Sequence, residues 1–169
     1  MVRRLLYGLG LCLLVAGCAN YNLGSTGPLK FHSLYVAPVI NNTKAPQAQA
    51  PVTEMLRQSL LQEGNLQLAN QEQADATLEV TLVAYESTIS ATSSNNTLNA
   101  QAYTLTMTAN CTLVDNRSGT VYFKNLPVNA SIETYVNGTN DLAEPEYQAM
   151  PLLARELGRK IKDLIVTTW

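Results

Sequence analysis

The longest stretch of strict alternation in the sequence, residues 102–114 (AYTLTMTANCTLV), constrains the fold most strongly. Its odd-numbered positions from Tyr103 to Leu113 are apolar, and its even-numbered positions from Thr104 to Thr112 are threonine or asparagine. Because successive side chains of a strand point to opposite faces, this pattern predicts a long β-strand with one buried and one polar face. Cys111 falls on the apolar face, so we expect its thiol to be buried and chemically inert.

Two further alternating segments flank this strand. Residues 76–86 (ATLEVTLVAYE) predict a strand, and an unbroken alternation would place Glu79 and Glu86 on opposite faces of it. Residues 120–136 (TVYFKNLPVNASIETYV) follow the turn sequence DNRSG at 115–119, which predicts an antiparallel hairpin. Residues 87–99 (STISATSSNNTLN) are too polar to pack against a core, and we expect a mobile loop or hairpin tip there.

Two segments have helical periodicity. In residues 51–64 (PVTEMLRQSLLQEG), apolar side chains recur every four residues, Pro51 suits the first helical position and Gly64 the C-terminal stop. Residues 144–166 form an amphipathic segment in which Pro151 either kinks the helix or starts its regular part. A short strand is expected at 33–41, where Pro38 indicates an edge position or a bulge.

The predicted order is therefore strand, helix, three strands and helix. Two amphipathic helices can cover one face of an antiparallel sheet, because each element must bury its apolar side against another. The sequence predicts a two-layer α+β domain, with two helices packed on one face of a mostly antiparallel four-stranded sheet.

The N-terminus has the pattern of a secretory signal. Arg3 and Arg4 precede an apolar run from Leu5 to Ala16, which is shorter than the ~20 residues that span a bilayer. The sequence Val-Ala-Gly-Cys that ends at Cys18 resembles the bacterial lipobox, in which the signal is cleaved before the cysteine and that cysteine carries the lipid. The alternative is an ordinary cysteine in a signal-anchor segment.

The lipobox implies a division of the chain and a location. We expect a signal peptide at 1–17, a lipidated tether at 18–32 that is rich in Gly, Asn and Ser, and a single α+β domain at 33–169. Ala19 rather than aspartate follows the cysteine, which by resemblance to the sorting rules of enteric lipoproteins favours the outer membrane, facing the periplasm. Without the signal peptide, nine Lys and Arg stand against 13 Asp and Glu, giving a formal charge of −4 that argues against nonspecific binding to nucleic acid.

The sequence contains few residues from which an enzyme active site could be built. The single histidine, His32, lies at the end of the tether, and Cys111 is the one cysteine left after the signal peptide and the lipidated residue are set aside. These residues cannot build a zinc cluster, a Cys/His pair or a disulfide within the mature chain. The sequence also lacks a glycine-rich phosphate loop, so we predict no catalytic residues, no metal site and no cofactor besides the lipid on Cys18.

The order and spacing of these elements resemble the outer-membrane lipopolysaccharide-assembly lipoproteins (LptE). The lipobox cysteine is followed closely by Tyr21 and Leu23. The other quoted pieces are LYVAPVINNT (34–43), ADATLEVTLVAYE (74–86), AYTLTMTANCTLVDNRSG (102–119), IETY (132–135) and LLARELGRKIKDLI (152–165). The departures are the polar segment 87–99 and Pro151. The resemblance covers nearly the whole mature chain.

The resemblance implies a non-enzymatic lipoprotein that plugs an outer-membrane β-barrel translocon (LptD-like) and assists it in assembling lipopolysaccharide into the outer leaflet. Lipopolysaccharide carries phosphates and acidic sugars, so Arg117 and Lys124 are candidate contacts, although both could be ordinary solvated side chains. Lys30 and Lys44 are weaker candidates. The runner-up is an outer-membrane lipoprotein that activates a periplasmic cell-wall (peptidoglycan) synthase. An anchored hydrolase is a third class, for which we find no constellation of residues.

Overall fold

The computed structural model describes residues 31–64, 66–93, 96–136 and 143–167. Cys18, the expected signal peptide and nearly all of the expected tether lie outside the described residues. Phe31, at the end of that tether, is 1% exposed and belongs to the hydrophobic core, so the packed domain includes at least this residue.

Three long antiparallel strands form the main body of the sheet. They are β4 (Ala76–Ser93), β5 (Asn96–Asp115) and β6 (Val121–Tyr135). Leu78 lies opposite Leu113, and Met107 lies between Tyr85 on β4 and Ala130 on β6. The predicted alternation of residues 102–114 is confirmed, since the odd-numbered positions of β5 from 105 to 113 are buried.

Three short parallel strands extend the sheet beyond β4. They are β1 (Ser33–Val36), β2 (Ile40–Asn41) and β3 (Gln67–Leu68). Two of them, β1 and β2, pair with β4 itself, and the third, β3, pairs with β1. The order across the sheet is β3-β1-β4-β5-β6, and β2 pairs with β4 further along that strand than β1 does. The predicted fold class is confirmed, but the described residues form six strands rather than four. The expected strand at 33–41 is divided by Pro38, which has no N–H to donate to a ladder.

Of the two alternatives expected at 87–99, the end of a hairpin is confirmed in the described residues and a loop is wrong there. β4 continues to Ser93 and β5 begins at Asn96, so the two strands form a hairpin that extends past the helices. The ladder between β4 and β5 pairs the backbone polar groups of these strands, although the side chains of residues 87–92 are all exposed. The Ser, Thr and Ile residues of this segment tolerate an exposed strand, and for this reason the absence of an apolar pattern did not exclude one.

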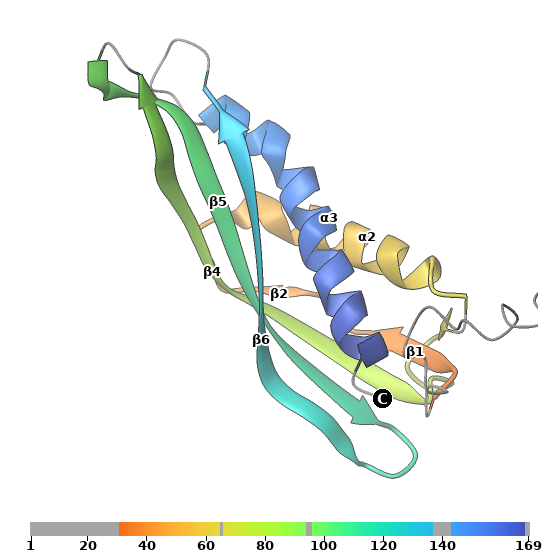
Figure 1. Ribbon diagram of the computed structural model, residues 1–169. Coiled ribbons are helices and arrows are strands. Elements are labelled where there is room, and N and C mark those ends of the chain that lie inside the picture. The colour runs from red at the N-terminus through yellow and green to blue at the C-terminus, as the bar shows by residue number, and fades with distance from the viewer. Residues whose placement is uncertain (1–30, 65, 94–95, 137–142, 168–169) are drawn as a thin grey trace, which may run out of the picture.

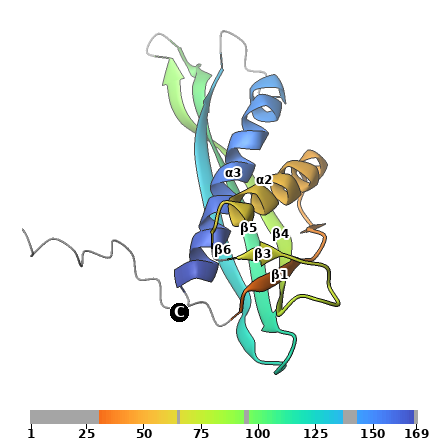
Figure 2. The same cartoon turned by 90° about the vertical axis from the view of Figure 1, so that its right-hand side faces the viewer.

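Both helices cover the same face of the sheet (Figures 1 and 2). A 3-10 turn, η2 (Pro46–Ala48), leads into α2 (Gln49–Leu61), so α2 begins two residues before the predicted Pro51 and ends before Gly64. Pro51 remains in the first turn, where a missing N–H breaks no helical hydrogen bond. The second helix, α3 (Ala143–Thr167), continues through Pro151 instead of starting there. Neither helix is at once long enough and apolar enough to cross a bilayer, within the part of the chain that the structure describes.

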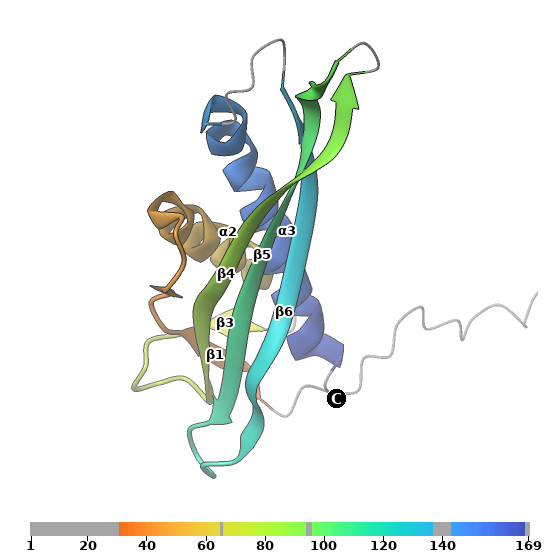
Figure 3. The same cartoon turned by 90° about the vertical axis from the view of Figure 1, so that its left-hand side faces the viewer.

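The core lies between the helices and the sheet. The helices contribute Leu56, Leu60, Leu153 and Leu157, which are 0% exposed. α2 and α3 approach each other closely at Gly158, where an added Cβ would lie 3.0 Å from the backbone nitrogen of Leu56 and 3.0 Å from the carbonyl of Met55. The two helices therefore pack as one layer, and the opposite face of the long strands is left without a covering element in the described residues (Figure 3).

Candidate functional site

The face of the sheet that points away from the helices is polar and weakly charged. Along its central strand, β5, it presents the predicted row of threonine and asparagine side chains, and the adjacent row on β6 contains Asn129, Ser131 and Glu133. Thr106 Oγ1 and Ser131 Oγ lie 2.9 Å apart across the two strands and share a hydrogen bond. This surface, which we call the open face, can make many hydrogen bonds and carries few charges.

A β-bulge at Val83 changes the expected placement of two carboxylates. The register shifts between Leu82 and Ala84, so the alternation of β4 changes phase there. Glu79 lies opposite Thr112 and Glu86 lies opposite Thr106, and both therefore belong to the open face. The expectation of opposite faces was wrong because it assumed an unbroken alternation. Six residues of β5, or about 20 Å, separate the two positions, which is too far for a catalytic pair.

Asp75 connects the first residues of the domain, at His32 and Ser33, to the β5–β6 turn. Its Oδ2 accepts hydrogen bonds from the backbone N–H groups of His32 and Ser33, both at 3.0 Å, and its Oδ1 forms an ion pair with Arg117. The His32 N–H is the largest cause that lowers the pKa of Asp75 below its usual range, followed by a hydrogen bond with the Ser33 side chain. The carboxylate is therefore ionised at neutral pH and holds the first residues of the domain in place.

The β5–β6 turn is built by its own polar residues. Asp115 Oδ1 accepts the backbone N–H groups of Arg117 and Ser118, both at 2.8 Å, and the Asn116 amide donates to the carbonyl of Ala74 at 2.8 Å. Gly119 takes a φ of +69°, a value that L side chains rarely adopt. The turn is thus held by hydrogen bonds within itself and by a hydrogen bond to Ala74, the residue before Asp75.

Arg117 and Lys124, the two candidate lipopolysaccharide contacts, lie in the same hairpin. Arg117 is in the turn with its side chain 81% exposed, so the ion pair with Asp75 leaves much of the guanidinium accessible. Lys124 is exposed and lies in a bulge with Asn125, where the two residues together oppose Thr112. Of the weaker candidates, Lys44 is exposed between β2 and η2, and Lys30 lies outside the described residues.

Cys111 lies in the core, as predicted. Its side chain is buried and burial raises the pKa of its thiol to about 12. The thiolate, which is the reactive form, is therefore scarcely populated at neutral pH.

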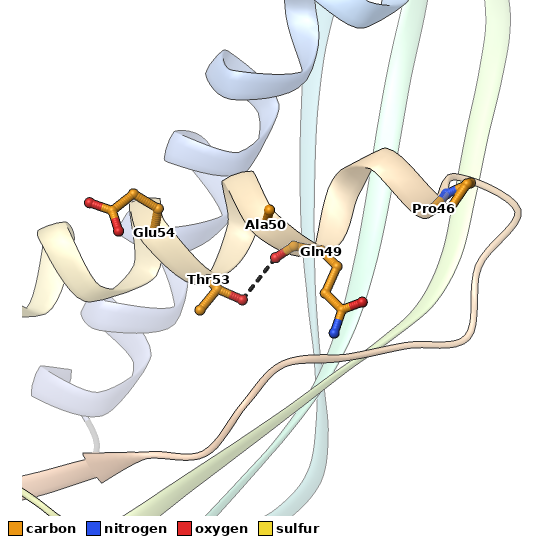
Figure 4. A pocket seen from close by; sticks show the side chains of 5 residues that line it. All are labelled: Pro46, Gln49, Ala50, Thr53 and Glu54. Carbon is orange, nitrogen blue, oxygen red and sulfur yellow. Dashed lines mark hydrogen bonds between the residues drawn. The ribbon is translucent and has the colours of Figure 1, made fainter.

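The described residues hold no group of three or more His, Cys, Asp or Glu side chains that could bind a metal ion. An open pocket lies over the first turns of α2, lined by Pro46, Gln49, Ala50, Thr53 and Glu54 (Figure 4). Two of its polar side chains already have partners, since the Thr53 hydroxyl donates to the carbonyl of Gln49 and the Gln49 amide donates to that of Val39. This pocket offers no pair of groups suited to acid, base or nucleophilic chemistry.

Sequence reasoning missed the role of Asp75. The one available signal was its position, an Ala-Asp pair directly before a strand. Its partners are backbone groups 42 and 43 residues away, which no local pattern reveals.

Comparison of the sequence with protein families gives one clear result. The model of a family described as LptE, lipopolysaccharide-assembly, matches residues 31–164, which is most of the chain. A search of curated proteins finds no match.

Solved structures share the fold at low sequence identity. The hypothetical protein CT253 from Chlamydia trachomatis is 12% identical, with 80% of this chain and 95% of that chain covered and a TM-score of 0.57. A minor lipoprotein from Acinetobacter baumannii is 15% identical, with 80% and 93% covered and a TM-score of 0.51. The uncharacterized lipoprotein B from Nitrosomonas europaea is 13% identical, with 82% and 81% covered and a TM-score of 0.50. At these identities the likeness shows a common α+β fold.

Proposed function

The chain belongs to the LptE lipopolysaccharide-assembly family, and we propose that it plugs an outer-membrane β-barrel translocon (LptD-like) and assists it in assembling lipopolysaccharide into the outer leaflet. Membership implies a role in lipopolysaccharide assembly and identifies the chain as a non-catalytic lipoprotein. The match over residues 31–164 is the observation that carries the proposal.

The open face supports a position inside a barrel. The lumen of a large membrane β-barrel is lined by polar residues and water, in contrast to its apolar outer surface. A plug in such a lumen needs a surface that replaces water through hydrogen bonds and does not bring many unpaired charges. The threonine and asparagine row of β5, flanked by Ser131 and Asn129 on β6, has this character.

The proposal includes an anchor in the outer membrane through a lipid on Cys18. In this proposal residues 1–17 are removed as a signal peptide, and the expected tether at 18–32, shortened at its end by the packing of Phe31, connects the lipid to the domain. Several acyl chains bind a membrane much more firmly than one, at ~0.8 kcal/mol per buried CH2, so the lipid keeps the protein at the periplasmic surface.

Co-purification tests the proposal. The full chain, expressed with a C-terminal tag, is extracted from outer membranes in detergent, and we expect a large β-barrel protein to be retained with it. Its intact mass, together with labelling by palmitate, should report cleavage before Cys18 and acylation of that residue. Recovery of a penicillin-binding protein without a barrel would instead support an activator of a cell-wall synthase and contradict the proposal.

Lipopolysaccharide binding is the second part of the proposal, with Arg117 and Lys124 as contacts. Charge-assisted hydrogen bonds from these side chains to phosphate are expected to contribute to affinity. We expect Lys124→Glu, and Arg117→Gln to a smaller extent, to weaken binding of purified lipopolysaccharide about tenfold or less, equivalent to at most about 1.4 kcal/mol. Gln is preferred at position 117 because a glutamate there would repel Asp75.

Arg155→Glu is the matched control for this measurement. Arg155 is exposed on α3, outside the β5–β6 hairpin in sequence, and its reversal changes the net charge by the same amount as Lys124→Glu. Equal weakening by both reversals would indicate a general charge effect, and unchanged binding in Lys124→Glu would remove the assignment of this site.

A further inference from the structure

The outer edge of β6 and the unpaired second half of the β4 edge differ in how they are protected from further pairing. On β6, the Lys160 ammonium donates a hydrogen bond to the carbonyl of Asn129 at 2.8 Å, which shows that this carbonyl points away from β5. Pro127, two residues earlier and in the same phase, has no N–H to offer at that edge. Lysine and proline are the devices by which natural sheets prevent another strand from pairing with them.

β4 lacks such protection over its second half. Its outer neighbour β2 ends at Asn41, and the N–H of Asn42 donates to the carbonyl of Leu82 at 2.9 Å. Beyond this point no strand formed by the described residues pairs with the outer side of β4 (Figure 1). All seven residues of Glu86–Thr92 are exposed, and none of them is a lysine or a proline.

The register shows which backbone groups this edge presents. The Leu82 carbonyl points away from β5, so its partner Ala109 points away from β4, and by alternation so do Met107, Leu105 and Tyr103. The β4 residues opposite these three are Tyr85, Ser87 and Ile89, whose N–H and C=O groups therefore face outward. Ile89 also has 55% of its surface exposed beside these groups.

This end of the molecule is acidic. In the sequence, residues 82–93, 96–107, 131–136 and 143–154 contain four carboxylates, Glu86, Glu133, Glu144 and Glu146, and no Lys, Arg or His. Glu86 lies on the edge strand itself, opposite Thr106. A strand that pairs with this edge is therefore favoured when it carries positive charge.

We propose that the β4 edge at Glu86–Thr92 is a strand-addition site for an extended segment of the barrel partner that carries Lys or Arg side chains. The inference rests on the proposed function, which supplies the barrel. Main-chain hydrogen bonds to Ser87 and Ile89 would provide affinity, and the carboxylates would select the basic segment. A second copy of this chain is a poorer occupant, because antiparallel pairing of two β4 edges would bring two acidic ends together.

Ser87→Pro tests the site because it removes an outward N–H and leaves the inward hydrogen bonds of β4 to β5 in place. Ser87→Ala is the matched control, since it removes the same hydroxyl and keeps the outward N–H. With the full lipidated chain and the purified barrel in detergent, we expect Ser87→Pro to weaken binding about tenfold and Ser87→Ala to leave it within a factor of two. Equal loss in both variants, or no loss in Ser87→Pro, would overturn the site.

A second pair of variants and an exchange measurement cover the case in which Ser87→Pro fails to fold. Glu86→Lys should weaken binding to the barrel, whereas Glu54→Lys, an equal charge reversal at an exposed position of α2 on the opposite side of the sheet, should not. In the wild-type complex the amides of Ser87 and Ile89 should gain protection from hydrogen exchange, and unchanged exchange at both would contradict the proposal. The wild-type protein could instead form a dimer through this edge. A dimer that is stabilised by Glu86→Lys or dissociated by Ser87→Pro would identify a second copy as the occupant and overturn the assignment.

If the wild-type protein retains no barrel, the proposed function fails as well.

Discussion

Gly158→Leu is expected to lower the free energy of unfolding by about 3 kcal/mol, the upper end of what overpacking usually costs. At this position a Cβ would already lie 3.0 Å from the backbone of Leu56 and of Met55. Backbone atoms in the middle of α2 cannot rotate aside as the end of a flexible side chain can. A larger side chain must therefore push α2 and α3 apart and open the core beneath them. Urea unfolding followed by circular dichroism measures the change as a lower midpoint.

Gly64→Leu is the control for this prediction. No atom lies within 4 Å of a Cβ built at Gly64, which is exposed after the end of α2. We expect a change in stability within about 0.5 kcal/mol, as for other surface substitutions. If Gly158→Leu were as stable as Gly64→Leu, the close contact between the two helices would not contribute to the fold as inferred.

The sequence predicted the parts of the fold that depend on long, uniform patterns. The alternation of β5 persists over more than ten residues, so its buried face could be assigned residue by residue, including Cys111. The helices had a stripe every four residues, and their existence was correct although their ends were displaced. The two-residue strands β2 and β3 are too short to carry a pattern, and they form because β4 and β1 offer backbone partners.

Single-residue irregularities escaped prediction. Val83 inserts one residue into the ladder of β4 and moves Glu86 to the face that carries Glu79, yet valine is an ordinary residue in a regular strand. The hairpin at 87–99 was expected as either a mobile loop or a hairpin tip, because its polar composition offers no apolar face from which long strands could be predicted. Its long, unprotected edge is the feature on which the strand-addition proposal depends.

The candidate site was predicted in part. Arg117 was chosen as a cation in an exposed turn, and the structure gives it an ion pair with Asp75 that sequence reasoning did not foresee. This pair crosses more than forty residues of sequence, so only the fold brings the two side chains together. Lys124 was assigned to a regular strand and lies in a bulge beside Asn125, whose φ of +50° marks the irregular backbone.

Asp75→Ala is expected to lower the free energy of unfolding by about 2 kcal/mol at pH 7, because it leaves two backbone N–H groups without their charged acceptor. These are the N–H groups of His32 and Ser33. Arg117→Ala should cost less than about 1 kcal/mol, since an ion pair with an exposed guanidinium is screened by water. The comparison separates the two interactions of the carboxylate. If Arg117→Ala were the more costly substitution, the ion pair with Arg117 would contribute more to stability than the hydrogen bonds from the His32 and Ser33 N–H groups.

The contribution of Asp75 to the free energy of unfolding should also depend on pH, and the lowered pKa of its carboxyl determines the direction of that dependence. Folding lowers the pKa of this carboxyl, mainly through the His32 N–H, so its contribution is complete above the unfolded value of about 3.9. That contribution is lost as the pH falls through the lower pKa of the folded state. The stability difference between wild type and Asp75→Asn, measured by urea unfolding, should therefore shrink from pH 7 toward acid. Glu79→Gln removes an exposed carboxylate from the neighbouring stretch of β4 and should change the stability at pH 7 by less than about 0.5 kcal/mol. A constant difference for Asp75→Asn would mean that the charge is not what stabilises this contact.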